Sequence, residues 1–202
     1  MPLIKYNNQS LSSITTLPAS IPTGKLKLIS SQTASNSASI SFTTGLSSTY
    51  KVYRFVFSSI HPRTDNVQFQ FNLSTDSGSN YNVTKTSTSF VAFHYEDDSY
   101  TVLEYDTGGD LAQSTGYQKI SRDLGSGADE SCSGSMTLFN PSSTTYVKHF
   151  ISRSSTNVYF DSMSDYNIAG YGNTTSAVNA IRFQMSSGNF DGTIYLYAID
   201  NS

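Results

Sequence analysis

The sequence predicts an all-β protein, a single antiparallel β-sandwich of the jelly-roll type with an extended N-terminal arm. Three observations predict this class. Apolar and polar residues alternate in many short segments, whereas no window of about 11–18 residues carries a helical apolar stripe. Turn-forming residues separate these segments at the spacing typical of sandwiches. Aromatic residues reach 13% and charged residues only 13%, with Ser, Thr, Asn and Gln as the polar remainder, which suits extended structure.

The length of 202 residues fits one domain, and the 37% of hydrophobic residues can supply its core. Residues 1–24 show no sustained period but contain several large apolar side chains. We therefore expect an arm that lies on another surface; a poorly ordered terminus is the alternative. The expected arm contacts are Leu3, Ile4, Tyr6, Leu11, Ile14 and Leu17. The β-sandwich domain is expected to cover residues 25–202.

The predicted strands begin at Lys25, where KLKLIS alternates. A polar turn is expected at SQTASNSAS, followed by the short strand SISF. The segment at 50–60, YKVYRFVFSSI, is apolar on both faces, which predicts a central strand covered on both sides, one of them by a partner subunit. Its faces are Tyr53, Phe55 and Phe57 on one side and Val52 and Val56 on the other. Pro62 ends the strand because proline cannot donate a hydrogen bond to the sheet.

Further strands follow along the chain. The segment 67–73 has the cleanest alternation, and another strand is expected at 89–96. The stretch 96–131 mixes acids and glycines, so long loops with one or two short strands are expected there. Short strands are then predicted at 136–139, 146–151, 157–160 and 167–171. The one place for a helical turn is 175–180, after the capping residue Asn173. Ten to twelve strands are expected in all.

The closing segment, Ala180–Ile199, predicts a β-hairpin whose last strand is paired inside a sheet. Two alternating runs flank a turn at 188–192, which is rich in glycine and asparagine. In the second run Ile194, Leu196 and Ala198 share one face, and Tyr195 and Tyr197 share the other. We expect a neighbouring subunit to cover both tyrosines, because tyrosine is enriched at interfaces. Stacking on a sugar is the alternative.

Composition excludes several classes of function. The net charge of −3 and the lack of a Lys/Arg run predict no binding to nucleic acid. No apolar run approaches the ~18 residues of a membrane helix, so no membrane insertion is expected. The first residues lack the parts of a signal peptide, and synthesis in a cytoplasm is expected. Cys132 lies in SCSGS, which offers no activating base, and is predicted to be an ordinary thiol.

No catalytic or cofactor motif is present. The chain lacks G-x-x-x-x-G-K-[ST], G-x-G-x-x-G and G-x-S-x-G. His61, His94 and His149 lie far apart, so structural histidines are favoured over a zinc site. The run Glu96-Asp97-Asp98 is a solvated acidic loop or, alternatively, a Ca²⁺ site. A glycosidase needs two nearby carboxylates, which any set of acids can supply, so this signal is nearly empty. We expect no enzyme activity, no cofactor and no metal.

Three segments carry a resemblance to a known family: LISSQTASNSASISFTTGLSSTYKVYRFVFSSIHP at 28–62, NPSSTTYVKHFI at 140–151 and NTTSAVNAIRFQMSSGNFDGTIYLYAI at 173–199. They resemble virion structural proteins of tailed bacteriophages, of the marine phage type and often tail-fibre-like. The resemblance spans most of the chain beyond the arm, with Ala198 where a glycine is more usual. It implies a rigid β-domain displayed on a phage particle as a homotrimer, and it carries no ligand-binding residues.

The expected function is therefore that of a non-enzymatic virion structural protein, made in the host cytoplasm. It is either a capsid decoration or a compact tail or fibre knob, and residues 1–24 are expected to hold it to the particle. The expected partners are other copies of the chain and other virion proteins of the capsid or the tail. The alternative is a receptor-binding domain that attaches to a glycan on the host surface.

Overall fold

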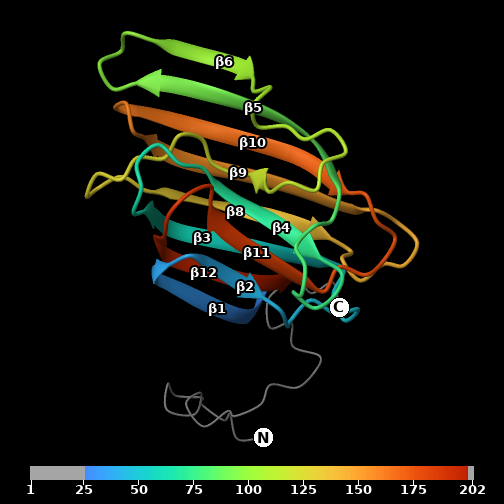
Figure 1. Cartoon of the computed structure of the whole chain (residues 1–202). Coiled ribbons are helices and arrows are strands. Elements are labelled where there is room, and N and C mark those ends of the chain that lie inside the picture. Colours follow the sequence, from blue (N-terminus) through green and yellow to red (C-terminus); the bar gives the residue numbers. More distant parts are fainter. Residues whose placement is uncertain (1–25, 200–202) are drawn as a thin grey trace, which may run out of the picture.

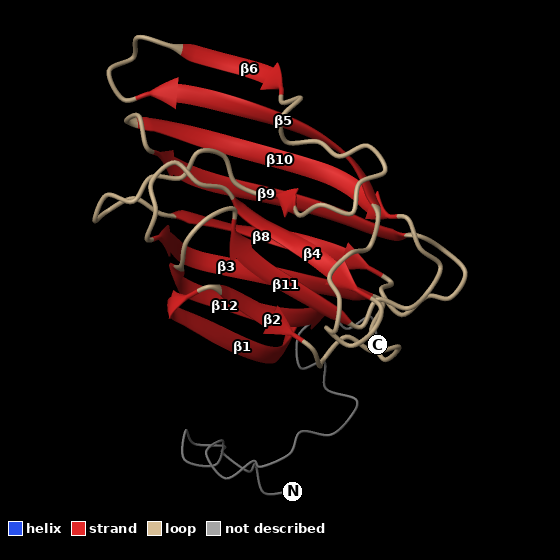
Figure 2. Cartoon of the chain, in the orientation of Figure 1, coloured by secondary structure: helices blue, strands red, loops and turns tan. Residues whose placement is uncertain are grey.

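The computed structural model of the chain describes residues 26–199. Twelve β-strands and no helix occur in this range (Figures 1 and 2). The strands are β1 (Leu26–Ser37), β2 (Ser39–Phe42), β3 (Val52–Pro62), β4 (Phe69–Ser74), β5 (Lys85–Tyr95), β6 (Thr101–Tyr105), β7 (Gln118–Lys119), β8 (Cys132–Phe139), β9 (Lys148–Val158), β10 (Ser162–Gly172), β11 (Ala180–Met185) and β12 (Phe190–Ile199). Accordingly, the described residues include no helix able to cross a membrane.

The strands form two antiparallel sheets of unequal size. The large sheet has eight strands in the order β1-β12-β3-β8-β9-β10-β5-β6, and the small sheet has four in the order β2-β11-β4-β7. Every registered strand pair in both sheets is antiparallel. The predicted all-β sandwich is thereby confirmed, with twelve strands in residues 26–199. The jelly-roll type stays a prediction.

Aromatic rings from both sheets fill the space between them. Phe183 on β11 lies at the centre and is fully buried. Its ring centroid is 6.4 Å from that of Phe42, 5.7 Å from Phe69 and 6.3 Å from Phe71, all on the small sheet. Phe55, on β3 of the large sheet, lies 5.3 Å away. Inward rings of the two layers thus pack against one another, as Phe183 does with Phe55, and this packing holds the two sheets together.

A long loop covers the part of the large sheet that the small sheet does not reach. Figure 1 shows β5 and β6 beyond the edge of the small sheet, with the 106–131 segment running across the inner side. Leu124 is fully buried and forms isolated bridges with Val67 and Val158. The Ser154 hydroxyl donates to the Ile120 carbonyl at 2.6 Å. The loosely patterned middle of the chain is therefore ordered by contacts with the sheet.

The closing segment is not a hairpin, contrary to the prediction. β11 pairs with β2 and β4 in the small sheet, whereas β12 pairs with β1 and β3 in the large sheet. The connection crosses from one layer to the other, and Gly192, with φ +131°, lies at the register shift that follows. Two strands with one apolar face each can bury those faces side by side or opposite one another, and alternation does not distinguish the two. The predicted interior position of the last strand is confirmed.

Three further differences from the prediction have a clear physical reason. The expected turn at SQTASNSAS is part of β1, which runs to Ser37 as an edge strand that keeps polar side chains in water. The predicted strands 146–151 and 157–160 are one strand, β9, because its serine-rich middle is also extended. The 175–180 stretch forms no helical turn: Asn179 donates its backbone N–H to the Ser74 carbonyl instead. β3, by contrast, lies centrally between β12 and β8, as predicted.

The aromatic core gives a prediction for stability. Replacement Phe183→Ala should lower the free energy of unfolding by about 3–5 kcal/mol, because it removes four ring contacts and leaves a cavity. Urea denaturation followed by circular dichroism measures the change. Tyr146→Ala, in a loop where the side chain is 69% exposed, is the control and should change the value by less than about 0.5 kcal/mol. A loss below about 1 kcal/mol for Phe183→Ala would contradict the central role of this ring.

Candidate interaction surface

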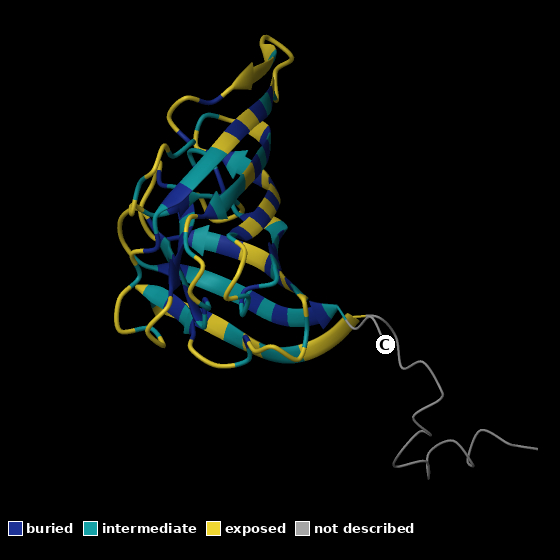
Figure 3. Ribbon diagram, turned by 90° about the vertical axis from the view of Figure 1, so that its right-hand side faces the viewer, coloured by how far each residue is buried: buried dark blue, intermediate teal, exposed yellow. Residues whose placement is uncertain are grey.

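The outer face of the large sheet is the side that points away from the small sheet. Along each strand the inward residues are buried and the outward ones are partly or fully exposed, as the alternating colours in Figure 3 show. Directly opposed residues on neighbouring strands share a face, so the register fixes which side chains meet there. The outer face exposes several large apolar and aromatic side chains, whereas a sheet face in contact with water usually carries polar ones.

One apolar patch, the β1–β12–β3 patch, lies at the edge where the described chain begins and ends. Leu28 is opposite Tyr197, and Tyr195 is opposite Val56 on the next strand. The exposed fraction of Leu28 is 51%. The members of this patch are Leu26, Leu28, Val52, Val56, Tyr195, Tyr197 and Ile199. The two tyrosine rings lie 6.3 Å apart between their centroids.

A second apolar patch, the β5–β6 patch, lies at the opposite edge of the same face. Phe90 is opposite Tyr105, and Ala92 is opposite Leu103. Leu103 is 72% exposed, the highest fraction among the large hydrophobic residues of the described chain. An uncovered edge strand with such side chains is a site where another chain can pair or pack.

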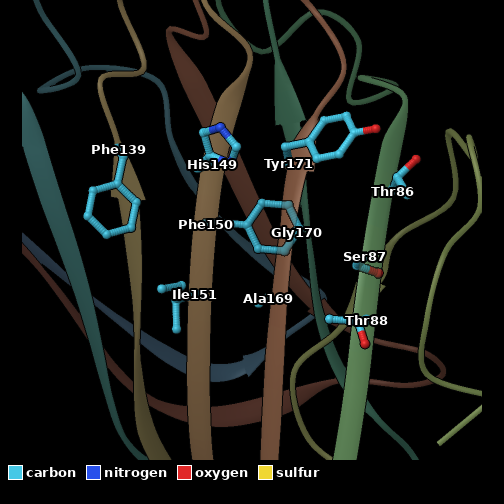
Figure 4. Close-up of a pocket in the computed structure, with 10 residues that line it drawn as sticks. All are labelled: Thr86, Ser87, Thr88, Phe139, His149, Phe150, Ile151, Ala169, Gly170 and Tyr171. Atoms are coloured by element: carbon cyan, nitrogen blue, oxygen red, sulfur yellow. The ribbon is translucent and has the colours of Figure 1, made fainter.

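A shallow apolar groove of about 560 Å³ lies between the two patches. Figure 4 shows its floor at Ala169 and Gly170, with Phe139 and Ile151 toward one side and Tyr171 toward the other. A Cβ atom at Gly170 would come within 2.6 Å of the Thr86 carbonyl oxygen. This missing side chain lies on the inner side, next to the ring of buried Phe150, and lets the strands approach closely. On the outer face, the small residue between larger neighbours is Ala169, opposite Ile151 on β9.

The outer face carries few charges, and those of Arg153 and Asp165 neutralise one another. Arg153 donates to both carboxylate oxygens of Asp165, at 2.8 and 2.6 Å. This guanidinium lowers the pKa of the Asp165 carboxyl. Arg54 donates to the Ser135 hydroxyl at 3.0 Å. The face is therefore nearly neutral and presents apolar groups together with hydroxyls that can still form hydrogen bonds.

Of the predicted contact residues, the structure places Tyr195 and Tyr197 on this face. Leu3, Ile4, Tyr6, Leu11, Ile14 and Leu17 lie outside the described residues. The sequence-based prediction missed Leu103 and Tyr105, because the stretch around them was interpreted as loop. It also missed Ile151, whose outward direction depends on the register of β9. Alternation within TVLEY at 101–105 was the available signal.

The residues considered for metal or acid–base chemistry are engaged locally and separately. His61 Nδ1 lies 2.7 Å from the Glu130 carbonyl oxygen, and His94 Nε2 lies 3.0 Å from an Asp98 oxygen. Hydrogen bonds from the Ser99 hydroxyl, and then from the Ser99 amide, lower the pKa of the Asp97 carboxyl. In residues 26–199, no group of three or more His, Cys, Asp or Glu side chains is placed to hold a metal ion. Burial raises the pKa of the Cys132 thiol.

Two buried lysines, away from the outer face, hold segments of the chain together by hydrogen bonds. Lys85 donates to Asn72 Oδ1 at 2.5 Å and to the Val83 carbonyl at 2.7 Å, and burial lowers the pKa of this amine to about 7. Lys148 donates to the Tyr146 and Thr174 carbonyls at 2.6 and 3.1 Å. Each lysine joins segments of the chain through oxygens, which is a structural role.

Asp106 joins the long loop to β10 through a hydrogen bond, and it also forms an ion pair within the loop. The Tyr166 hydroxyl donates to Asp106 Oδ2 at 2.7 Å, and Arg122 Nη1 lies 3.1 Å from Asp106 Oδ1. Burial, and then the hydrogen bond to Asp106, raise the pKa of Tyr166. The carboxylate thus has a partner on each oxygen and is only 7% exposed. It is positioned to hold the loop, with both oxygens already engaged.

The outer face is the feature of the described chain that most needs a functional explanation. Contiguous exposed apolar patches on soluble proteins mark sites of interaction. Comparisons of the chain with protein-family models, with curated proteins and with solved structures found no match.

The low pKa of Lys85 predicts how stability depends on pH. The folded value of about 7 lies below the ordinary value of 10.5, so the unfolded chain binds more protons between these pH values. Stability should therefore rise with pH above about 7, by up to about 1.4 kcal/mol per unit, and this contribution should be constant below it. Urea unfolding at about pH 6, 7, 8 and 8.5 measures the slope. These values lie on both sides of the folded pKa of about 7.

Replacement Lys85→Met should remove this rise, since no titrating amine remains. Subtracting the profile of the variant from that of the wild type cancels the other titrating groups. Lys51→Met, at an exposed position before β3, is the matched control and should keep the wild-type profile. Parallel profiles for the wild type and Lys85→Met would contradict a buried amine that loses its proton near neutral pH.

Proposed function

We propose that this chain is a non-enzymatic structural protein of a bacteriophage virion that self-associates through the outer face of its large sheet. The observation that carries the self-association is the near-neutral outer face, with apolar patches at both edges and an apolar groove between them. The assignment to a phage particle rests on the resemblance of the segments 28–62, 140–151 and 173–199. The occupant of the face is a second copy of this chain.

The face is large enough for a stable interface. Strands about 4.8 Å apart and about ten residues long, at about 3.3 Å per residue, give eight strands an area on the order of 1,000 Å². A standard interface buries about 800 Å² on each partner. Its core is typically depleted in charge and enriched in tyrosine, phenylalanine and methionine. The outer face meets both conditions, with Tyr195, Phe90 and Met163 among its members.

The arrangement of the two patches favours a ring over a two-fold dimer. The β1–β12–β3 patch and the β5–β6 patch differ in sequence and lie at opposite edges of one face. A contact between two different patches is heterologous, and such contacts close into rings when the rotation allows it. A homotrimer, in which each chain gives one patch to each neighbour, uses both patches and leaves neither exposed.

The ends of the described chain suggest how the domain is attached. Leu26 and Ile199 are directly opposed on β1 and β12, so both ends leave from one corner of the sheet. Residues 1–24 precede this corner in the sequence, and we propose that they reach other virion proteins of the capsid or the tail. The opposite corner, at the β5–β6 turn, would then point away from the particle (Figure 1). Capsid decoration and a compact tail knob both fit this arrangement.

The proposed interface gives a prediction about oligomeric state. The wild-type chain at micromolar concentration should be a trimer by native mass spectrometry and by light scattering. Tyr197→Glu in one patch and Leu103→Glu in the other should each be monomeric, because each buries an unpaired charge in the contact. Tyr146→Glu, at an exposed loop position, is the matched control and should stay trimeric. A monomeric wild type, or variants that all remain trimeric, would refute the interface.

Mixing the two monomeric variants distinguishes a ring from a symmetric dimer. In a heterologous contact, the intact β5–β6 patch of Tyr197→Glu can still bind the intact β1–β12–β3 patch of Leu103→Glu. The mixture should therefore form a one-to-one heterodimer that does not close. A chain lacking residues 1–24 should remain trimeric, since the contact lies in the described sheet. Loss of the trimer on this deletion would move the contact to the arm.

A further inference from the structure

A cluster of aromatic rings forms the tip of the sandwich where the β5–β6 turn meets the β9–β10 turn. Tyr95 and Tyr100 come from the first turn, and Phe160 from the second. The Tyr95 centroid lies 5.3 Å from that of Tyr100 and 5.4 Å from that of Phe160. Tyr159 packs edge-on against Phe160 at 4.9 Å. Figure 1 places this tip diagonally opposite the corner where β1 begins.

Two cavities flank this cluster and share Tyr95 and Phe160 as a common wall. One has a volume of about 430 Å³ and is bounded by the acids Glu96, Asp97 and Asp161. The other has a volume of about 230 Å³ and is bounded by further aromatic residues and by polar groups. The polar groups of the second cavity are Glu104, Arg122 and Asp123. An extended ligand could therefore place one unit on each side of a single aromatic ridge.

We propose that this tip binds a neutral oligosaccharide, with one sugar ring in each cavity. Aromatic rings offer flat faces with a negative quadrupole, against which the C–H groups of a pyranose can pack. The carboxylates at the cavity rims can accept hydrogen bonds from adjacent sugar hydroxyls. Ligand sites combine such apolar walls with a few placed polar groups. The tip provides both on each side of the ridge.

The charges around the cavities select against other ligands. Acids outnumber the single cation, Arg122, so an anionic sugar would be repelled. Aromatic residues with nearby acids can also bind a quaternary ammonium group. Here the Arg122 guanidinium already lies 5.5 Å from the Phe93 ring centroid and 3.1 Å from an Asp123 oxygen. One aromatic face and one carboxylate are thus occupied by a cation of the chain itself.

The tip remains accessible when the outer face is covered. Side chains alternate along β6, so Val102 and Glu104, which bound a cavity, point away from Leu103 and Tyr105. Tyr100 is 48% exposed. The sugar site is therefore independent of the proposed assembly, although a trimer would carry three copies and gain avidity for a repeated glycan.

Binding can be tested with the full chain and a defined panel of probes. The panel contains neutral oligosaccharides of glucose, galactose and mannose, with sialyllactose and choline as the charged arms. Isothermal titration calorimetry and saturation-transfer NMR should detect at least one neutral oligosaccharide. They should detect neither sialyllactose nor choline. Binding of choline or sialyllactose alone, or of no probe, would overturn the proposal.

Variants assign the binding to the tip. Tyr100→Ala should weaken binding by roughly three- to tenfold through loss of a stacking surface. Tyr146→Ala, at an exposed tyrosine outside the tip, is the matched control and should leave the dissociation constant unchanged. Equal affinity in Tyr100→Ala and the wild type would refute the site. The monomeric variant Tyr197→Glu should bind each sugar as the wild type does per chain, so failure of assembly and failure of sugar binding are distinguishable.

Discussion

The unequal size of the two sheets is the constraint on which the rest of the molecule depends. Eight strands have two faces, but four strands can cover only part of one of them. The aromatic layer around Phe183 holds the covered part together, and the long loop anchored by Asp106 and Tyr166 covers more of the same side. The described residues, 26–199, contain no further strand for the other side. Because the described strands are too few to cover both faces of the large sheet, its outer face is left with exposed apolar residues, and nothing in residues 26–199 lies over it.

Alternation in the sequence predicts which side chains share a face, but it does not predict which strands are neighbours. It correctly placed Ile194, Leu196 and Ala198 toward the core and Tyr195 and Tyr197 away from it. It could not show that β11 and β12 lie in different sheets, because both arrangements bury the same residues. Pairing depends on contacts between segments far apart in the chain, such as Leu26 with Ile199. Local pattern contains no information on those contacts.

The candidate surfaces were only partly predictable for the same reason. Tyr195 and Tyr197 were predictable as residues of the outer face, because their strand is buried on its other face. Leu103 and Tyr105 become part of the outer face only through the pairing of β6 with β5. The tip is less predictable still: Tyr100 and Phe160 are 60 positions apart, and the pairing of β5 with β10 brings their turns together. Composition shows that such aromatic residues are abundant, whereas topology decides where they gather.

Exposed aromatic residues gather at two different places in the described chain, and the neighbouring charges distinguish these places. On the outer face, the Arg153–Asp165 pair is closed on itself, so the surrounding rings face a nearly neutral surface that suits another copy of the chain. At the tip, Tyr95 and Phe160 stand between the carboxylates that bound the two cavities, which suits a ligand rich in hydroxyl groups. The first arrangement gains from the complete exclusion of water. The second depends on polar groups that remain at the surface, and it lies at the end of the molecule farthest from the corner where the described chain begins.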